Sequence, residues 1–187
     1  MSDGDIPNQK RAFGFLFIAI AIAIFGATLF GELSFYSGSS NYYSTVWIFT
    51  FVTIMGISIY KLRYLLVLIR NRMKTSIKWP TYVKIINGLC WAGPFLLIPV
   101  FHSLYPYLIL IGIGIGNIST YLFLRIYSKN DNKEQLLVGF LSMCMAPTLL
   151  LFSTTLFSNR PDIVLILSRL LIGVSYGLGG IYAIFTK

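Results

Sequence analysis

Six long apolar stretches dominate the chain, and short polar segments separate them. Each holds about 20 residues, enough for an α-helix to cross the roughly 30 Å hydrocarbon core of a bilayer. Lipid offers backbone groups no hydrogen-bond partner, so such stretches cross membranes as helices. The pattern therefore predicts an all-α, polytopic membrane helical bundle of about six transmembrane helices in a single domain, residues 1–187. The predicted spans are residues 13–31, 46–66, 82–101, 107–127, 136–157 and 162–186.

The composition favours the same class of protein. Of the 187 residues, 56% are hydrophobic and 11% are charged, whereas about a quarter of the residues of a soluble domain are charged. Spans and short connections use almost every residue, so no room remains for a soluble catalytic domain. The first apolar stretch lacks the small-residue cleavage site of a signal peptide, and we expect it to stay uncleaved.

The net charge of +9 is explained by membrane topology rather than by nucleic acid. The basic residues cluster where apolar stretches end, and cytoplasmic loops carry an excess of Lys and Arg. Apart from Arg169, which lies inside a span, a six-span arrangement assigns only Arg160 to the outer side. We therefore expect a multi-pass protein of the cell (plasma) membrane, with cytoplasmic N and C termini and no nucleic-acid partner. The residues assigned to the inner side are Lys10, Arg11, Lys61, Arg63, Arg70, Arg72, Lys74, Lys78, Lys84, Arg125, Lys129, Lys133 and Lys187.

Arg169 is the one charge that falls well inside a predicted span. It follows Asp162 by seven residues, which is about 10 Å along a helix, so its charge begins in the outer half of the bilayer. An intramembrane charge indicates a functional site. Its candidate acidic partners are Glu32, after the first span, and Asp162, at the start of the last. Arg169 is thus a candidate to bind an anionic substrate. The alternatives are an arginine that extends outward to water, or one held structurally by tyrosine hydroxyls and free carbonyls.

Two predicted spans carry faces of small and polar residues. Small residues spaced by one turn allow helices to approach closely, and the glycines that predict such packing are Gly112, Gly116, Gly173, Gly177 and Gly180. The polar residues on or beside these faces are Asn117, Ser119, Thr120 and Tyr176. They are candidates to line a polar intramembrane path near Arg169. The alternative is that they hold neighbouring helices together by hydrogen bonds.

Prolines interrupt two of the predicted spans. Pro94 and Pro99 fall in residues 82–101, and Pro147 falls in residues 136–157. Each proline removes a backbone donor and frees a carbonyl one turn earlier. Broken helices are typical of transporter binding sites, but proline is also common in ordinary membrane helices.

Residues 61–74 predict a basic helix that continues the second span and leaves the bilayer. Arg63, Arg70 and Lys74 share one face, and leucines and an isoleucine occupy another. This pattern is typical of a segment lying on the membrane surface. Anionic lipid headgroups, together with the lipid bilayer itself, are its expected partners.

Motifs for catalysis or metal binding are largely absent. His102 is the only histidine, and Cys90 and Cys144 lie inside apolar runs without the spacing of a zinc site. No pair of acids occurs within one span to act as general acid and base. The sequence therefore predicts no cofactor and no metal, and it favours a non-catalytic protein.

Two functions from different classes fit this pattern. The first is a small transporter or channel-like protein for a small, anionic solute, with its site near Arg169. The second is a non-catalytic accessory or assembly subunit of a larger membrane protein complex. In that case the small-residue faces pack against partner membrane subunits or against further copies in a homo-oligomer. The two functions differ in the role they give to Arg169.

Overall fold

The structure, a computed structural model, describes residues 5–37 and 42–186, apart from the side chains of residues 5–9, 71–72 and 75–77. No strand occurs among these residues, so the predicted all-α class is confirmed. Lys187 and the side chain of Arg72, both counted above for topology, lie outside the described residues. The helices are α1 (Asp5–Tyr36), α2 (Tyr43–Lys61), α3 (Arg63–Ile77), α4 (Thr81–Leu96), the short 3₁₀ helix η2 (His102–Leu104), α5 (Tyr105–Ser128), α6 (Lys133–Thr155) and α7 (Pro161–Phe185).

Five of the described helices are long and apolar enough to cross a membrane. They are α1, α2, α5, α6 and α7, and they coincide with five of the six predicted spans. A chain with five such helices has the character of an integral membrane protein.

The predicted span 82–101 differs from the other five. Regular helix α4 has 16 residues and ends at Leu96, which gives a length of about 24 Å, shorter than the hydrocarbon core. Pro94 lies inside its last turn, and Pro99 lies among the turns that occupy residues 97–100. Because each proline lacks an N–H donor, the regular pattern of helical hydrogen bonds ends at Leu96. The chain then continues through turns into η2.

The predicted second span is also shorter than expected. It was predicted over residues 46–66, but α2 ends at Lys61 and a separate helix, α3, starts at Arg63. Leu65 and Ile69 of α3 are buried, and they lie against Ala12 and Leu16 of α1. The chain turns at Leu62 because this places the two apolar side chains on α1 and leaves the basic residues outside the bundle.

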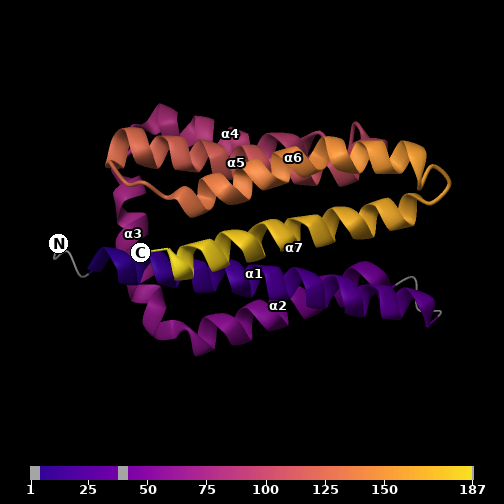
Figure 1. Cartoon of the computed structure of the whole chain (residues 1–187), viewed down its shortest axis with the longest axis horizontal. Helices are drawn as coiled ribbons and strands as arrows, with labels where there is room; N and C mark the ends of the chain where they lie inside the picture. Colours follow the sequence, from indigo (N-terminus) through magenta and orange to yellow (C-terminus); the bar gives the residue numbers. More distant parts are fainter. Residues whose placement is uncertain (1–4, 38–41, 187) are drawn as a thin grey trace.

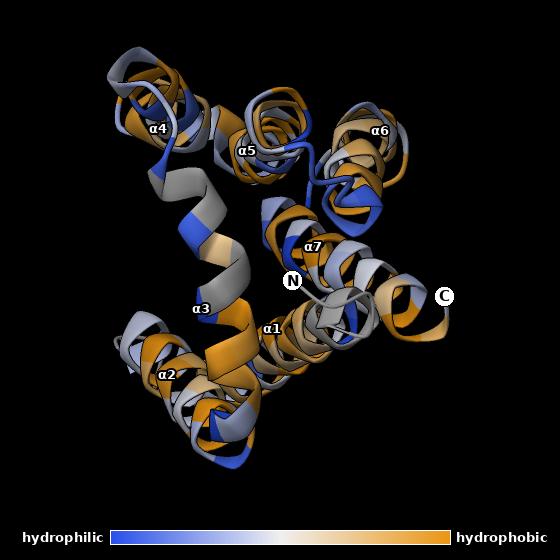
Figure 2. Ribbon diagram, turned by 90° about the vertical axis from the view of Figure 1, so that its left-hand side faces the viewer, coloured by the Kyte–Doolittle hydropathy of each residue, from blue (hydrophilic) through white to orange (hydrophobic). Residues whose placement is uncertain are grey.

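The long helices run side by side, and α3 crosses one end of them. Figure 1 shows α3 at the end where both chain termini lie, running from α2 to α4. Helix α1 packs on α2 and α7, and α5 packs on α4, α6 and α7. In the end-on view of Figure 2, α2 and α4 form the two edges of this arrangement, with α3 passing between them. We call the opposite end of the bundle, away from the termini, the distal end.

Glycines on α5 and α7 allow close approach at most of the predicted packing positions. A Cβ added at Gly180 would lie 2.7 Å from the backbone oxygen of Gly14. Side chains of other helices fill the space at Gly112, Gly116 and Gly173, where Phe95, Trp91 and Phe25 would lie 2.7, 2.4 and 2.9 Å from an added Cβ. At Gly177 the nearest atom would be 3.7 Å away, an ordinary contact. Of these five glycines, Gly180 is the one whose added Cβ would meet backbone atoms of another helix.

Candidate functional site

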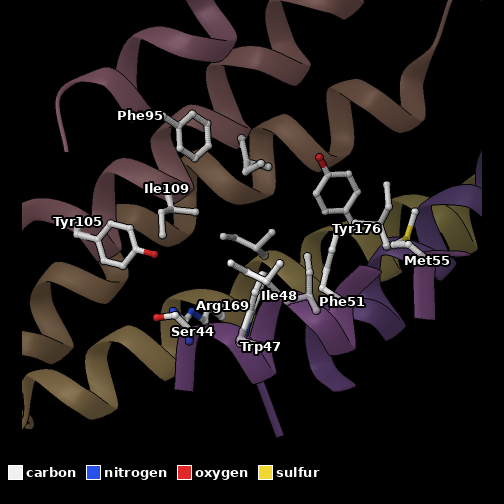
Figure 3. A pocket seen from close by; sticks show the side chains of 14 residues that line it. Ser44, Trp47, Ile48, Phe51, Met55, Phe95, Tyr105, Ile109, Arg169 and Tyr176 are labelled. Carbon is white, nitrogen blue, oxygen red and sulfur yellow. The ribbon is translucent and has the colours of Figure 1, made fainter. Parts of the chain in front are cut away.

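A cavity of about 600 Å³ lies between α1, α2, α5 and α7, with Phe95 of α4 at its wall. Figure 3 shows the 14 side chains that line it. Most are aliphatic or aromatic. The lining residues are Ile20, Ile24, Ser44, Trp47, Ile48, Phe51, Met55, Phe95, Tyr105, Ile109, Ile113, Arg169, Ile172 and Tyr176. A volume of this size is typical of a site for one small ligand.

Arg169 is the single charged residue in this lining. It is half-buried on α7, and its guanidinium carbon lies 5.2 Å from the ring centroids of both Tyr43 and Trp47 on α2. Aromatic faces attract a cation at this distance. Figure 3 places Arg169 beside Ser44, at the distal end of the cavity. The aromatic contacts therefore lower the cost of partly burying this charge.

Tyr43 connects Arg169 to Glu32. Its hydroxyl accepts a hydrogen bond from Nη1 of Arg169 and donates one to Oε1 of Glu32 at 2.7 Å. Among the described residues, no carboxylate lies within ion-pair distance of Arg169. Glu32, one of the two acids predicted as partners, is thus linked to Arg169 only through the hydroxyl group of Tyr43. The positive charge of Arg169 is consequently not neutralised by direct contact.

Asp162, the other predicted partner, contacts a different arginine. Its carboxylate accepts hydrogen bonds from Nη2 of Arg160 at 2.9 Å and from Nε at 3.2 Å. Arg160 lies two residues before Asp162, whereas Arg169 lies two turns after it along α7. The carboxylate of Asp162 therefore pairs with the nearer arginine, Arg160. The hydrogen bonds and the charge of Asp162 raise the pKa of Arg160, which lies before α7. Asp162, a candidate partner of Arg169, therefore pairs with Arg160 in the structure.

A second, smaller cavity adjoins the first at the distal end. It measures about 310 Å³, and Ser44 lines both cavities. Glu32, Tyr43 and Asp162 line the smaller cavity, whereas Arg169 lines the larger one. The hydrogen bond between Tyr43 and Arg169 therefore lies where the two cavities meet.

The predicted polar residues of α5 lie in two different places. Asn117 is buried, and its side-chain amide donates to the backbone oxygen of Ile113 at 2.9 Å and to the Tyr176 hydroxyl at 3.4 Å. Tyr176 in turn lines the Arg169 cavity. Asn117 therefore does not line the cavity itself, but its side chain hydrogen-bonds to Tyr176, which does.

Ser119 and Thr120 face α4 rather than the cavity. Their hydroxyls lie 2.8 and 3.1 Å from Oδ1 of Asn87, and Thr120 also accepts a hydrogen bond from the indole of Trp91 at 3.0 Å. These contacts join α4 to α5. Of the predicted polar set, Arg169 and Tyr176 line the cavity, and Ser119 and Thr120 do not.

Sequence reasoning missed Tyr43 and Trp47 as neighbours of Arg169. The two residues are four positions apart at the start of α2, so they lie on one face of that helix. Such an aromatic pair near the end of a predicted span was a usable signal, because aromatic faces and phenol hydroxyls are good neighbours for a desolvated guanidinium.

The basic residues predicted to meet lipid headgroups lie on the exposed side of α3. Arg63, Arg70 and Lys74 are exposed, whereas Leu65 and Ile69 on the same helix are buried. Arg63 also lies 5.4 Å from the ring centroid of Tyr60. The helix therefore separates its charged and apolar sides at the end of the bundle that carries the termini.

Within the described residues, no group of three or more His, Cys, Asp or Glu side chains is placed to hold a metal ion. Cys90 and Cys144 are free thiols. The chain matches no protein-family model, no curated protein and no solved structure. Its functional interpretation therefore depends on the chemistry of the Arg169 cavity.

Proposed function

We propose that this protein is a six-span membrane protein that binds and moves a small anionic solute through the Arg169 cavity. The observation that carries the proposal is a cationic side chain at the wall of an apolar cavity of about 600 Å³, with which no carboxylate of the described residues pairs directly. In low-dielectric surroundings such a charge attracts an anion strongly. The proposed location is the plasma membrane, with both termini in the cytoplasm.

The number of crossings is argued from the positions of the helix ends. The start of α1 and the end of α7 lie at one end of the bundle (Figure 1), which supports an even number of crossings. Helix α3 lies at that end, whereas Tyr105, the first residue of α5, lines the cavity together with Ser44 near the start of α2. The chain between α3 and α5 must therefore travel the length of the bundle. Helix α4, the turns of residues 97–100 and η2 together provide this sixth crossing.

The distribution of basic residues supports the same orientation. The connections at the end of α3 and between α5 and α6 carry many Lys and Arg residues, whereas the distal connections carry Arg160, which is paired with Asp162. An excess of positive charge is typical of the cytoplasmic side. In this orientation α3 lies in the inner headgroup layer, where Arg63, Arg70 and Lys74 meet anionic lipid.

Flux measurements with matched arginine variants test the proposal. The full-length protein is reconstituted in liposomes, and uptake of radiolabelled butyrate and of inorganic phosphate is followed. Arg169→Ala is expected to reduce uptake of the transported anion about tenfold or more, because a charged hydrogen-bond donor is lost. Arg160→Ala, which removes an exposed arginine outside the cavity, is the control. Equal flux through wild type and folded Arg169→Ala protein would refute the transport function.

An accessory or assembly subunit is the second candidate, and helix α2 favours it. None of its residues is buried, and large side chains that do not line the cavity, such as Phe49, Val52 and Tyr60, are exposed. Either a partner helix or lipid could cover this exposed face of α2. Purification in a mild detergent distinguishes the two cases, because a subunit brings down a stoichiometric partner, whereas an independent transporter elutes alone or as a homo-oligomer.

A further inference from the structure

We propose that the ligand of the Arg169 cavity is a single-chain amphiphile with a carboxylate head, and that it enters sideways from the lipid between α2 and α4. This inference rests on the proposed function, because it takes Arg169 as the anion site and specifies the class of anion. It follows from the chemistry of the walls, the hydrogen-bonding state of Arg169 and the position of the opening.

The walls of the cavity are unsuited to a hydrophilic anion. Besides Arg169, polar atoms come from Ser44, the indole of Trp47 and the hydroxyls of Tyr105 and Tyr176, and the other lining side chains are apolar. A small hydrated anion would lose most of its water and find few partners here, which disfavours its binding. A molecule with one charged end and a hydrocarbon tail matches these walls.

The polar and apolar parts of the cavity are separated along its length. Figure 3 shows Arg169, Ser44 and Tyr105 towards one end and Met55 with Tyr176 towards the other. On α2, Ser44 and Met55 are eleven residues apart, which corresponds to about 16 Å along the helix axis. The cavity therefore accommodates a head at its distal end and an extended chain running towards the middle of the bundle.

Arg169 has the capacity to bind a carboxylate. A guanidinium has five N–H donors, and within the described residues only a bond from Nη1 to the Tyr43 hydroxyl engages one of them. The remaining donors can form the two parallel hydrogen bonds that arginine makes to a carboxylate. Because no second cation lines the cavity, a singly charged head balances the site better than a doubly charged one.

The position of the cavity favours entry from the lipid. Its walls include Ile48 and Met55 of α2 and Phe95 of α4, the two edge helices of the bundle (Figure 2). Helix α2 packs mainly on α1, and α4 packs mainly on α5, so the two edges do not close on each other. From the distal aqueous side, in contrast, an anion first meets the smaller cavity, which carries the carboxylates of Glu32 and Asp162.

The test uses the full-length protein in nanodiscs of phosphatidylcholine, with radiolabelled dodecanoate as the probe. Wild type is expected to bind dodecanoate saturably. Butyrate, which has the head but not the tail, and dodecanol and dodecyltrimethylammonium, which have the tail but not the negative charge, are expected to compete at least about tenfold less well. Butyrate competing as well as dodecanoate would overturn the proposed ligand class.

Substitutions at two positions, Arg169 and Ile109, test the charge and the volume of the cavity separately. Arg169→Ala is expected to weaken binding about tenfold or more, and Arg169→Lys to weaken it less, because lysine keeps the charge but not the planar fork. Ile109→Trp leaves the charge in place and fills the cavity, so it is also expected to abolish binding. Ile126→Trp, at an exposed position of the same helix, is its control. Size-exclusion elution and the thermal unfolding midpoint verify that each variant is folded.

The results separate this inference from the proposed function. Arg169-dependent butyrate or phosphate uptake without dodecanoate binding keeps the transport function and overturns the amphiphile. Arg169-dependent dodecanoate binding without any anion flux keeps the amphiphile and overturns transport. Dodecanoate binding that survives both Arg169→Ala and Ile109→Trp overturns the assignment of the ligand to this cavity.

Discussion

Tyr43 and Arg169 are 126 residues apart in the chain, yet the Tyr43 ring centroid lies 5.2 Å from the guanidinium carbon and the Tyr43 hydroxyl accepts a hydrogen bond from Arg169. Helix α2 otherwise packs mainly on α1 and α3. The contact therefore ties the distal end of α2 to α7.

Removing the Tyr43 hydroxyl is expected to destabilise the protein. Tyr43→Phe keeps the ring beside Arg169 but removes the acceptor for the guanidinium and the donor for Glu32. Hydrogen bonds between membrane helices contribute about 0.6 kcal/mol on average, and those to charged groups contribute more, so we expect the free energy of unfolding to fall by about 1–2 kcal/mol. Denaturant titration in mixed micelles, followed by circular dichroism, measures the change. Tyr42→Phe, at the exposed neighbouring position, is the control, and equal losses from both variants would contradict the prediction.

The α1–α7 contact predicts different outcomes for two glycines on the same helix. In Gly180→Ala the new Cβ would lie 2.7 Å from the Gly14 oxygen and 3.0 Å from the Ile18 nitrogen, both backbone atoms that side-chain rotation cannot move. We expect a loss of about 1–3 kcal/mol in the free energy of unfolding, the usual cost of overpacking. Gly177→Ala is the matched control, since its Cβ would make an ordinary 3.7 Å contact with Ala21. Thermal unfolding of both variants checks this, and similar midpoints would show that the helices separate easily.

Cysteine labelling decides whether the short helix α4 completes a crossing. In a background with Cys90 and Cys144 replaced by serine, Lys78→Cys reports on the connection between α3 and α4, Ser103→Cys on η2, and Ser158→Cys on the connection before α7. The six-span arrangement predicts that an impermeant maleimide labels Ser103→Cys and Ser158→Cys from outside intact cells, and labels Lys78→Cys only after permeabilisation. Labelling of Lys78→Cys and Ser103→Cys from the same side would exclude a crossing by α4.

Charge reversal on α3 is expected to change which lipids accompany the protein. Replacing Arg63, Arg70 and Lys74 by glutamate removes three exposed cations, each worth about 1 kcal/mol near an anionic membrane surface. We therefore expect fewer anionic lipids to co-purify from mixed phosphatidylglycerol and phosphatidylcholine membranes, as counted by mass spectrometry. Arg160→Glu, on the opposite end, serves as the control. If the triple variant retains as much phosphatidylglycerol as wild type, α3 does not lie in the headgroup layer.

The sequence alone was sufficient for the class of fold. Apolar runs of about 20 residues have only one way to satisfy their backbone groups in lipid without partner strands, which is to form helices. Five predicted spans accordingly coincide with long helices. The predictions failed in detail where local chemistry interrupted a run. Pro94 and Pro99 shorten the third predicted span, and the basic residues around Leu62 turn the chain into α3.

The neighbours of Arg169 depended on tertiary structure. Hydropathy and spacing identified the charge, and they identified Asp162 as an acid on the same helix. They contained no information on which other helix lies beside α7, because packing of helices across a bundle is determined by the summed fit of many side chains. The structure places Tyr43 and Trp47 of α2 against the guanidinium and leaves Asp162 with Arg160.

The sequence by itself therefore determined that the chain forms apolar helices with one arginine well inside an apolar segment, since length and hydrophobicity are properties of single segments. Only the tertiary structure decided that this arginine lies at one end of an apolar cavity, connected to Glu32 through Tyr43. The physical reason is that a cavity and its lining exist only between helices, and helices from both halves of the chain contribute most of these walls.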